Sequence, residues 1–428
     1  MFPNSSTTPL YVAIDIGKNV HSYAAYAGPD FSVVLPPCEV RNTRSGFAQF
    51  QTWLSGQLAS GRYAPVVVGL EPTGVYHEAW AQALSQTFGP QVQLRLLNPY
   101  QTKQKRQQLQ GGRRRKTDAL DDQALAYCLR DGLGYPLRLR PAAEVRFELW
   151  AHDFRQVQQE RLQLQVRLLT QIDRLWPGAL IKVKAFHQAH PHLEVPQPWV
   201  QARPLERRFV RLILTYAPNP YTWLDQSPDQ ICTFFRSHGL RCGPVTAHKL
   251  WQTVQQGLKP SPEVASVLAE HLQTDFTRYQ QLEGQLAQLR QQAEALVPGS
   301  PAAVLTSFPG VHAYLAAQYL AYVGEVQRFQ NADQIWALAG FDVAQDESGD
   351  RRRKGHISRR GEPGFRLVLF TLGLTTSQAC PVIAQAKQRA QRHGKGSIGA
   401  VIHAAHKANR ICYHLLRQQE PYDPHRAR

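Results

Sequence analysis

The N-terminal part of the chain begins with Tyr11-Val12-Ala13-Ile14-Asp15-Ile16-Gly17, a short apolar run that ends in glycine. A run of this kind is typical of a buried β-strand. Residues 21–27 and 31–40 show two further strand patterns, and the turn signal Gly28-Pro29-Asp30 separates them. Together the three strands predict an antiparallel meander that leads away from the first strand.

Helix and strand patterns alternate after this meander. Residues 47–58 and 76–88 have the apolar spacing of helices, whereas residues 65–71 and 91–97 have that of strands. The element order is therefore three strands, helix, strand, helix and strand, which is the order of the ribonuclease H-like fold. We expect an α/β domain with this fold over residues 1–143.

A polar, basic link is expected between the last strand and a following helix. The link covers residues 101–116, and its Gly111-Gly112 pair predicts a hinge. The helix is expected to run from about Asp118 to about Arg130. The basic residues of the link are candidates for binding nucleic acid: Lys103, Lys105, Arg106, Arg113, Arg114, Arg115 and Lys116.

The second half of the chain has mostly helical patterns. Residues 144–178 and 262–298 predict two long coiled-coil helices, and the second carries a heptad seam. The seam predicts either a coiled-coil dimer or a helix packed within its own chain. Residues 179–261 are expected to be an insertion of unknown role, and residues 299–428 a mostly helical C-terminal domain. The seam consists of Tyr279, Leu282, Leu286, Leu289, Ala293 and Leu296.

The charge of the chain indicates a polyanionic partner. Its 428 residues include 49 Lys and Arg against 32 Asp and Glu, a net charge of +17, and nucleic acid is the commonest partner of such proteins. A hydrophobic share of 43% excludes a wholly disordered chain. Six cysteines without CxxC spacing argue against a disulfide scaffold and a zinc site. Since the sequence shows neither a membrane-length apolar run nor a signal region, we expect a soluble, cytoplasmic protein.

Five acidic residues are candidates for a metal site. Asp15 lies on the first strand and Glu71 at the end of the fourth, so both are expected at one edge of the sheet. Asp118, Asp121 and Asp122 begin the helix after the basic link. Converging carboxylates repel each other unless a hard cation such as Mg²⁺ or Mn²⁺ lies between them. The alternative is that each acid is a surface charge or a helix N-terminal charge.

A serine beside a second basic cluster is the candidate nucleophile. Ser348 precedes Gly349 in a predicted loop, where its hydroxyl would be accessible, and Ser358 competes for the role on the same grounds. Guanidinium groups near the serine can bind phosphates through paired hydrogen bonds. The alternative is that the Ser-Gly pair is simply a turn. The basic residues of this cluster are Arg351, Arg352, Arg353, Lys354, Arg359 and Arg360.

Taken in this order, the motifs resemble those of the insertion-sequence one-ten family of transposases. These are DEDD-type recombinases guided by a bridge RNA, and the family also includes Piv-like DNA invertases. The resemblance covers about residues 10–175 and 265–415. Its N-terminal motifs are Tyr11 to Lys18, Gly69 to Tyr76, Asn98-Pro99 and Lys116-Thr117-Asp118-Ala119-Leu120-Asp121. Its C-terminal motifs are Phe308-Pro309-Gly310-Val311, Arg328-Phe329, Ala339-Gly340-Phe341, Ser348-Gly349 and Ile357-Ser358-Arg359-Arg360-Gly361.

The resemblance implies a RuvC-like domain of ribonuclease H fold, a coiled coil and a helical transposase domain. It also implies a division of the chemistry between two groups of residues. The acids Asp15, Glu71, Asp118 and Asp121 would bind Mg²⁺, and the serine at position 348 would form a covalent link to the cleaved DNA. Asp122 stands where the family commonly has alanine, so it is an alternative fourth acid.

The resemblance further implies several partners. They are target DNA, donor DNA and a structured noncoding RNA, the bridge RNA, which pairs with both DNAs. A homo-oligomer, dimer or tetramer, would combine acids and serine from different subunits. The family implies a bacterial or archaeal, nucleoid-associated protein in the cytoplasm, with no membrane partner. Two other functions are compatible with the sequence: a hydrolytic ribonuclease H-like nuclease such as a junction resolvase, without a covalent intermediate, and an inactive nucleic-acid scaffold.

Overall fold

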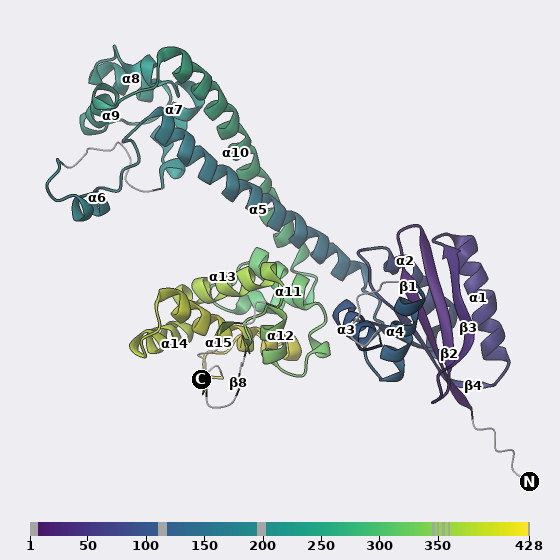
Figure 1. Cartoon of the computed structure of the whole chain (residues 1–428). Coiled ribbons are helices and arrows are strands. Elements are labelled where there is room, and N and C mark those ends of the chain that lie inside the picture. Colours follow the sequence, from purple (N-terminus) through teal and green to yellow (C-terminus); the bar gives the residue numbers. More distant parts are fainter. Residues whose placement is uncertain are drawn as a thin grey trace, which may run out of the picture. The chain divides into compact units, whose positions relative to one another are not determined.

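The structure is a computed structural model, and it describes residues 7–109, 118–194, 203–344, 347–348, 351–352, 356–357 and 360–426 (Figure 1). The chain divides into two compact units, Met1–Pro141 and Ala142–Arg428. This boundary lies close to the end of the α/β part expected from the sequence. The finer division of the second half into domains stays a prediction.

The first unit is built on a mixed six-stranded sheet with the strand order β3-β2-β1-β4-β5-β6. The predicted antiparallel meander is formed by β1 (Thr8–Ile16), β2 (Val20–Ala27) and β3 (Ser32–Arg41). Next to it, β4 (Tyr63–Leu70) lies parallel to both β1 and β5 (Gln93–Leu96). The short β6 (Tyr135–Pro136) pairs antiparallel with β5.

Helices cover both faces of this sheet because successive residues of a strand point to opposite sides. Val12 and Ile14 of β1 face a core that includes Phe50 of α1 and Trp80 of α2. Ala13 of the same strand faces the opposite core, which α4 covers. The helices of this unit are α1 (Arg44–Ala59), α2 (His77–Phe88), α3 (Pro99–Leu109) and α4 (Asp118–Arg130).

The predicted polar link is helical in its first part. The expectation of a link over residues 101–116 is wrong for residues 101–109, which belong to α3, and residues 110–117, with the predicted hinge, lie outside the described residues. The side-chain oxygen of Asn98 accepts a hydrogen bond from the Tyr100 amide at 2.9 Å, which supports the helix start. Lys, Arg and Gln are good helix formers, but they form no apolar stripe that would reveal the helix in the sequence.

Two long helices, α5 (Ala142–Leu175) and α10 (Pro262–Leu296), pair in the second unit. Their hydrogen bonds join residue numbers that rise on one helix as they fall on the other, so the helices run antiparallel. The bonded pairs are Trp150 with Leu289, Arg161 with Tyr279, and Gln171 with Asp275, at 2.9, 3.0 and 2.9 Å.

This helix pair contributes to a first hydrophobic core together with helices of the predicted insertion. Leu168 of α5 and Leu272 of α10 pack in it with Ile213, Phe235 and Leu250 of the inserted helices. The described part of residues 179–261 is therefore a packed helical structure rather than an extended linker. Its helices are α6 (Val183–Ala189), α7 (Arg208–Tyr216), α8 (Pro228–Ser237) and α9 (Pro244–Gln256).

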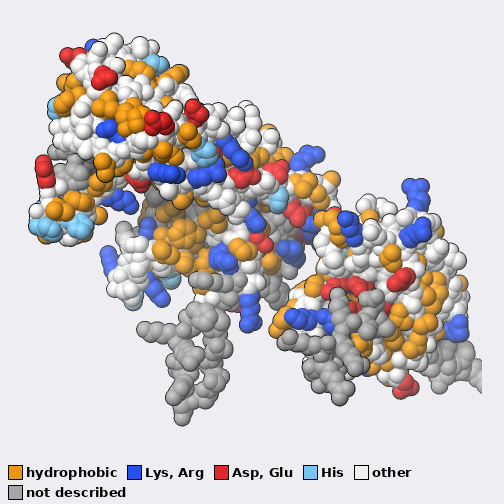
Figure 2. Space-filling view, turned by 45° about the horizontal axis from the view of Figure 1, so that its top comes forward, with side chains coloured by type: hydrophobic (Ala, Val, Ile, Leu, Met, Phe, Trp, Pro, Cys, Tyr) orange, Lys and Arg blue, Asp and Glu red, His pale blue; other side chains and the backbone are white. Residues whose placement is uncertain are grey.

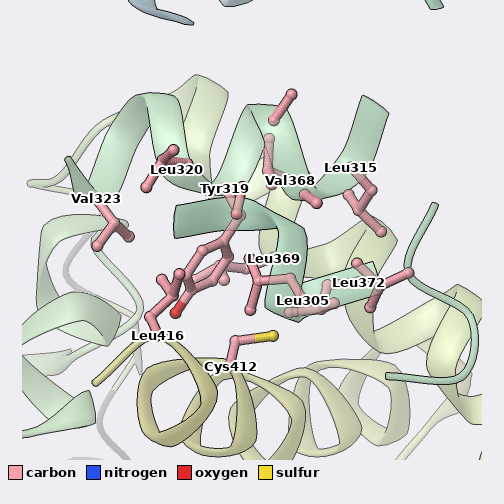
Figure 3. Packing of buried hydrophobic residues seen from close by; sticks show 14 of the residues in the cluster. Leu305, Leu315, Tyr319, Leu320, Val323, Val368, Leu369, Leu372, Cys412 and Leu416 are labelled. Carbon is pink, nitrogen blue, oxygen red and sulfur yellow. The ribbon is translucent and has the colours of Figure 1, made fainter. Parts of the chain in front are cut away.

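A second core belongs to the C-terminal helices. Tyr319, Leu369 and Leu416 are buried in it, and Figure 3 shows their side chains close together. Phe147 and Trp150 of α5 belong to the same core. The prediction of a mostly helical C-terminal part is thus confirmed. Its helices are α11 (Ala313–Val323), α12 (Ala332–Leu338), α13 (Pro363–Ala379), α14 (Pro381–Arg392) and α15 (Ser397–Gln418).

Short elements connect the helices. Four two-residue strands follow α12: β7 (Val343–Ala344), β8 (Glu347–Ser348), β9 (Arg351–Arg352) and β10 (His356–Ile357). Short 3₁₀ helices cover Gly89–Gln91, Pro204–Glu206, Pro220–Trp223, Pro301–Ser307 and Val326–Arg328. Among the described residues, no helix is long and apolar enough to cross a membrane by itself. Only α13 and α14 taken together have that length and composition, and the chain bends by 108° between them.

The heptad seam of α10 is filled within the chain. Tyr279, Leu282 and Leu286 are between 2% and 5% exposed, and they belong to the two cores that α10 shares with α5 and the shorter helices. Of the two arrangements that the seam predicts, the structure therefore has the one within a single chain. The seam gives no argument for an oligomer.

Replacing a seam leucine tests this arrangement. Leu286→Ala should lower the free energy of unfolding by about 2–4 kcal/mol because it leaves a cavity in the core. The exposed Val267 on the same helix provides the control, and Val267→Ala should change the free energy of unfolding by less than about 0.5 kcal/mol. Denaturant unfolding at two protein concentrations measures both. A loss that shrinks at the higher concentration would instead indicate a seam filled by a second chain.

Candidate functional site

Two of the predicted acids lie at the carboxyl ends of adjacent parallel strands. The β1–β4 register pairs Ile14 with Leu70, so Asp15 and Glu71 follow at neighbouring positions. The Glu71 amide donates to the Ile14 carbonyl at 3.4 Å and continues the pairing. By the alternation along each strand, both residues belong to the face that α4 covers. The edge position predicted from the sequence is therefore present in the fold.

Glu71 is half-buried next to other negative charges. Burial raises its pKa above the ordinary glutamate value, and the charges of Asp15 and Asp121 raise it further. A hydrogen bond with the Thr102 side chain and the charge of Arg106 act in the opposite direction but do not cancel the rise. Asp15 and Asp121 are therefore each close enough to Glu71 for their negative charges to act on it.

The two adjacent acids of α4 have different surroundings. Asp121 is 5% exposed, forms an ion pair with Arg106 of α3 and acts on Glu71. Asp122 is fully buried, accepts a hydrogen bond from the Ser22 hydroxyl of β2 at 2.5 Å and raises the pKa of Tyr26 on the same strand. The geometry therefore associates Asp121, rather than Asp122, with Glu71.

Two basic residues of α3 are engaged with acids of the same unit. Lys105 forms an ion pair with Asp131, and Arg106 forms the ion pair with Asp121. If Lys105 and Arg106 contact nucleic acid as predicted, these ion pairs must open or be shared. Lys103 of the same helix is exposed. Figure 2 shows acidic side chains gathered on this unit with basic side chains beside them. The remaining basic residues of the predicted cluster, Arg113, Arg114, Arg115 and Lys116, lie outside the described residues.

Thr102 lies beside the acids, although it is not among the site residues predicted from the sequence. This residue of α3 is 2% exposed, its hydroxyl donates to the Asn98 carbonyl at 3.3 Å, and its side chain is near enough to Glu71 to lower the pKa of that carboxyl. A sequence signal exists in the helix start at Asn98-Pro99, which puts the threonine within the first turn of α3. The interpretation of these residues as a link concealed it.

The acids form an incomplete oxygen cluster. Among the described residues, no group of three or more His, Cys, Asp or Glu is arranged to hold a metal ion. The predicted ligand Asp118 begins α4, but its side chain lies outside the described atoms. The mutual repulsion felt by Glu71 is what a hard cation would relieve, and carboxylate oxygens are the ligands that Mg²⁺ and Mn²⁺ prefer.

The candidate nucleophile lies in a short strand pair instead of a loop. Ser348 of β8 is opposite Arg351 of β9, and Glu347 is opposite Arg352. β7 and β10 form a separate two-stranded pair. The expectation of an irregular loop at Ser348 is wrong for the described backbone. The side chains of Ser348, Arg351 and Arg352, and all atoms of Arg353, Lys354, Ser358 and Arg359, lie outside the description, while Arg360 is exposed.

Ser348 belongs to a segment, residues 341–361, that we call the serine segment. Its two ends are held together by tight backbone packing. A Cβ atom on Gly361 would lie 2.2 Å from the Gly340 nitrogen and 2.3 Å from the Leu338 oxygen. The Glu362 amide donates to the same Leu338 carbonyl at 2.8 Å. Arg366 of α13 donates to the Ala339 carbonyl at 2.8 Å. The Ala339-Gly340-Phe341 motif and Gly361 therefore hold the two ends of the serine segment together.

Sequence comparison gives two family matches. Residues 12–177 match a transposase family of the DEDD type of IS110, and residues 302–389 match the transposase IS116/IS110/IS902 family. A probable family 20 transposase of Pseudomonas aeruginosa is 26% identical over 190 residues, which are 43% of this chain and 55% of the relative. A 43.6 kDa uncharacterized protein of insertion element IS110 from Streptomyces coelicolor is 27% identical over 136 residues, 32% of this chain and 34% of the relative. The chain thus spans between 34% and 55% of the length of these relatives.

Neutralising Glu71 should stabilise the metal-free protein. Its raised pKa means that the folded state holds the proton more tightly than the unfolded state. Stability therefore falls as the pH rises from about 4.3, the unfolded value, through the raised pKa. In EDTA, Glu71→Gln should raise the midpoint of thermal unfolding at pH 8, and the gain should vanish below about pH 4.

The control for this prediction is Glu39→Gln, which removes an exposed acid of β3 from the same unit. It should leave the midpoint at pH 8 unchanged. If Glu71→Gln lowers the midpoint at every pH, the carboxylate is stabilising and the proposed repulsion is absent.

Proposed function

Because two parts of the chain match models of the IS110/IS116 family of transposases, we propose that it cleaves and rejoins DNA to move a mobile element. The observation that carries this proposal is the convergence of Asp15, Glu71 and Asp121 at the end of two parallel strands. Burial and, after it, the neighbouring carboxylates raise the pKa of Glu71, so the ionised cluster destabilises the free protein. It is therefore better explained by a bound cation than by folding.

We propose that the first unit has the RuvC-like ribonuclease H fold. The strand order and directions support this assignment, because an antiparallel three-stranded meander is followed by two strands parallel to its first member. The acids then come from the central strands β1 and β4 and from α4, which is where such a fold would bring them together.

We propose that Asp15, Glu71, Asp118 and Asp121 hold Mg²⁺ or Mn²⁺. A divalent cation bound there would stabilise the attacking and leaving oxygens of a phosphodiester displacement. The chain's own residues partly favour the ionised carboxylates, because the Thr102 side chain and the charge of Arg106 act to lower the pKa of Glu71, and Arg106 forms an ion pair with Asp121.

We propose Ser348 as the nucleophile. Its hydroxyl oxygen would bond to phosphorus and lose its proton, while the bond from phosphorus to a deoxyribose oxygen breaks and that oxygen gains a proton. Attack by a second deoxyribose hydroxyl on the phosphoserine would rejoin the DNA and restore the serine, so no other reactant is consumed. The register opposite Arg351 supports this role, since it brings a basic position next to the serine.

We propose that an RNA partner selects the DNA and that the active protein is a homo-oligomer. Support comes from the family resemblance and from the net charge of +17, which suits a protein that holds nucleic-acid backbones. An oligomer would allow the acid cluster of one chain to act with the serine segment of another. The second candidate function, a hydrolytic nuclease, uses the same acids without the serine.

Replacing the serine separates these two functions. Ser348→Ala should retain DNA binding but lose covalent protein–DNA adducts, which are measured by denaturing electrophoresis with end-labelled DNA. Ser358→Ala is the matched control and should retain the adducts. If the loss follows Ser358→Ala instead, that serine is the nucleophile, and full cleavage without any adduct in the wild-type chain would establish the hydrolytic mechanism.

Comparing the two adjacent acids tests the metal proposal. Asp121→Asn should lower the cleavage rate at least about 100-fold because it removes a ligand, an effect of several kcal/mol on the transition state. Asp122→Asn should act mainly on stability, because Asp122 contacts Ser22 instead. Cleavage rates over a range of Mn²⁺ concentrations measure the difference. Cleavage that persists in EDTA, or equal losses in both variants, would contradict the assignment.

A further inference from the structure

A small cavity in the second unit takes no part in the chemistry proposed above. Its volume is about 80 Å³, and it lies among four helices, α5, α10, α11 and α13. On α11 the lining residues are four positions apart, so they share one face of the helix. The polar and backbone groups that matter for its chemistry come from Arg155, Arg290, Tyr314, Gln318, Tyr322 and Gly364.

Gln318 contributes a side-chain amide to the lining of the cavity. The residue is 9% exposed, lines the cavity and has no hydrogen-bond partner among the described residues. Leu315 and Tyr319, on the other side of α11, lie in the hydrophobic core that Figure 3 shows. In the described part of the chain, the amide atoms of Gln318 are not among the enclosed side-chain atoms that lack a partner, so the amide is accessible in the cavity and can donate a hydrogen bond to a ligand there.

Two guanidinium groups suit the cavity to an anion. Arg290 lies over the ring of Tyr314 at 5.5 Å and has no acidic partner among the described residues. Arg155 donates to Glu362 at 2.7 Å and lies 3.5 Å from the Tyr322 hydroxyl. No Asp or Glu is among the described residues that line the cavity. Glu362, which also accepts from the Gly364 amide at 3.2 Å, offsets the charge of Arg155. The net positive charge at the cavity therefore comes from Arg290, which is exposed.

Gly364 allows the Tyr322 and Arg155 side chains to lie close to the first turn of α13. A Cβ atom at this position would lie 2.2 Å from the Tyr322 hydroxyl oxygen and 2.4 Å from a guanidinium nitrogen of Arg155. The glycine is the second residue of α13, a 17-residue helix whose N-terminal end favours negative charge. Only a residue without a side chain allows the helix start, the hydroxyl and the guanidinium to meet.

We propose that this cavity binds one phosphate group of a nucleic-acid backbone, with Arg290, Arg155 and the Gln318 amide as its donors. A single phosphate is the kind of oxyanion that fits a cavity of this size and charge. The identity of the ligand as nucleic acid rests on the proposed function, whereas the anion chemistry does not. Glu362 links Arg155 to the base of the serine segment, so the bound phosphate lies beside the anchored end of that segment.

Inorganic phosphate tests the anion chemistry without nucleic acid or metal. In EDTA, phosphate should raise the midpoint of thermal unfolding of the full chain, relative to chloride at equal ionic strength. Arg290→Gln and Gln318→Leu should each abolish this gain. Gln318→Leu removes no hydrogen bond among the described residues, so it should unfold at or above the wild-type midpoint without phosphate, and a lost gain cannot be ascribed to misfolding.

Labelled DNA tests the nature of the ligand. Fluorescence anisotropy in EDTA should show that Arg290→Gln binds about tenfold more weakly than wild type, with a salt slope smaller by about one. The control is Arg278→Gln, which removes an exposed arginine of the same helix that pairs with Glu160. Its affinity should change less than twofold.

The outcomes separate this inference from the proposed function. Equal losses for Arg278→Gln and Arg290→Gln, or no loss in either, overturn the phosphate site while DNA binding itself stands. Phosphate stabilisation with unchanged DNA affinity in Arg290→Gln also overturns it, because the cavity then holds a free anion only. A wild-type chain that binds no DNA at all contradicts the proposed function, and the phosphate assay still decides the anion chemistry.

Discussion

The close approach of α4 to β4 is the contact on which the acid cluster depends. A Cβ atom on Gly69 would lie 2.4 Å from a methyl carbon of Leu129, so any side chain there would displace the Leu129 side chain that packs α4 on the sheet. With glycine at this position, α4 packs on the sheet and brings Asp121 near the end of the neighbouring strand. The glycine before Leu70-Glu71 thus serves the site through packing rather than through contact with a substrate.

Charge and packing oppose each other in this part of the fold. The apolar residues of α4, such as Leu125 and Leu129, favour the position that crowds the carboxylates together. The ion pairs from α3 offset part of the repulsion, because Arg106 and Lys105 each bind an acid on or just after α4. Helix α3 has almost no apolar surface and is therefore held in place by these ion pairs. In contrast, α5 and α10 are held by two hydrophobic cores.

Much of the fold could be predicted from the sequence because buried strands and helices place their apolar residues at regular intervals along the chain. The meander, β4 and the long helices all have apolar residues at the spacing of their structure, and each lies close to the predicted range. Periodicity could not reveal α3, whose residues are polar on every side, nor the strand pair at Ser348, which depends on partners across the segment. It also could not choose between Asp121 and Asp122, because adjacent residues of a buried helix end both point inward, and only the neighbours on α3 and β2 distinguish them.

The ion pair between Arg106 and Asp121 has a thermodynamic consequence for ligand binding. In the free chain the guanidinium is the counter-ion of the carboxylate, so a metal ion that binds this carboxylate must compete with it. Each metal ion bound would release one guanidinium at the edge of the sheet, where it can accept a phosphate instead. Cation and polyanion would then favour each other's binding by the same factor, as linkage requires. The order in which the two ligands arrive would not change the assembled complex.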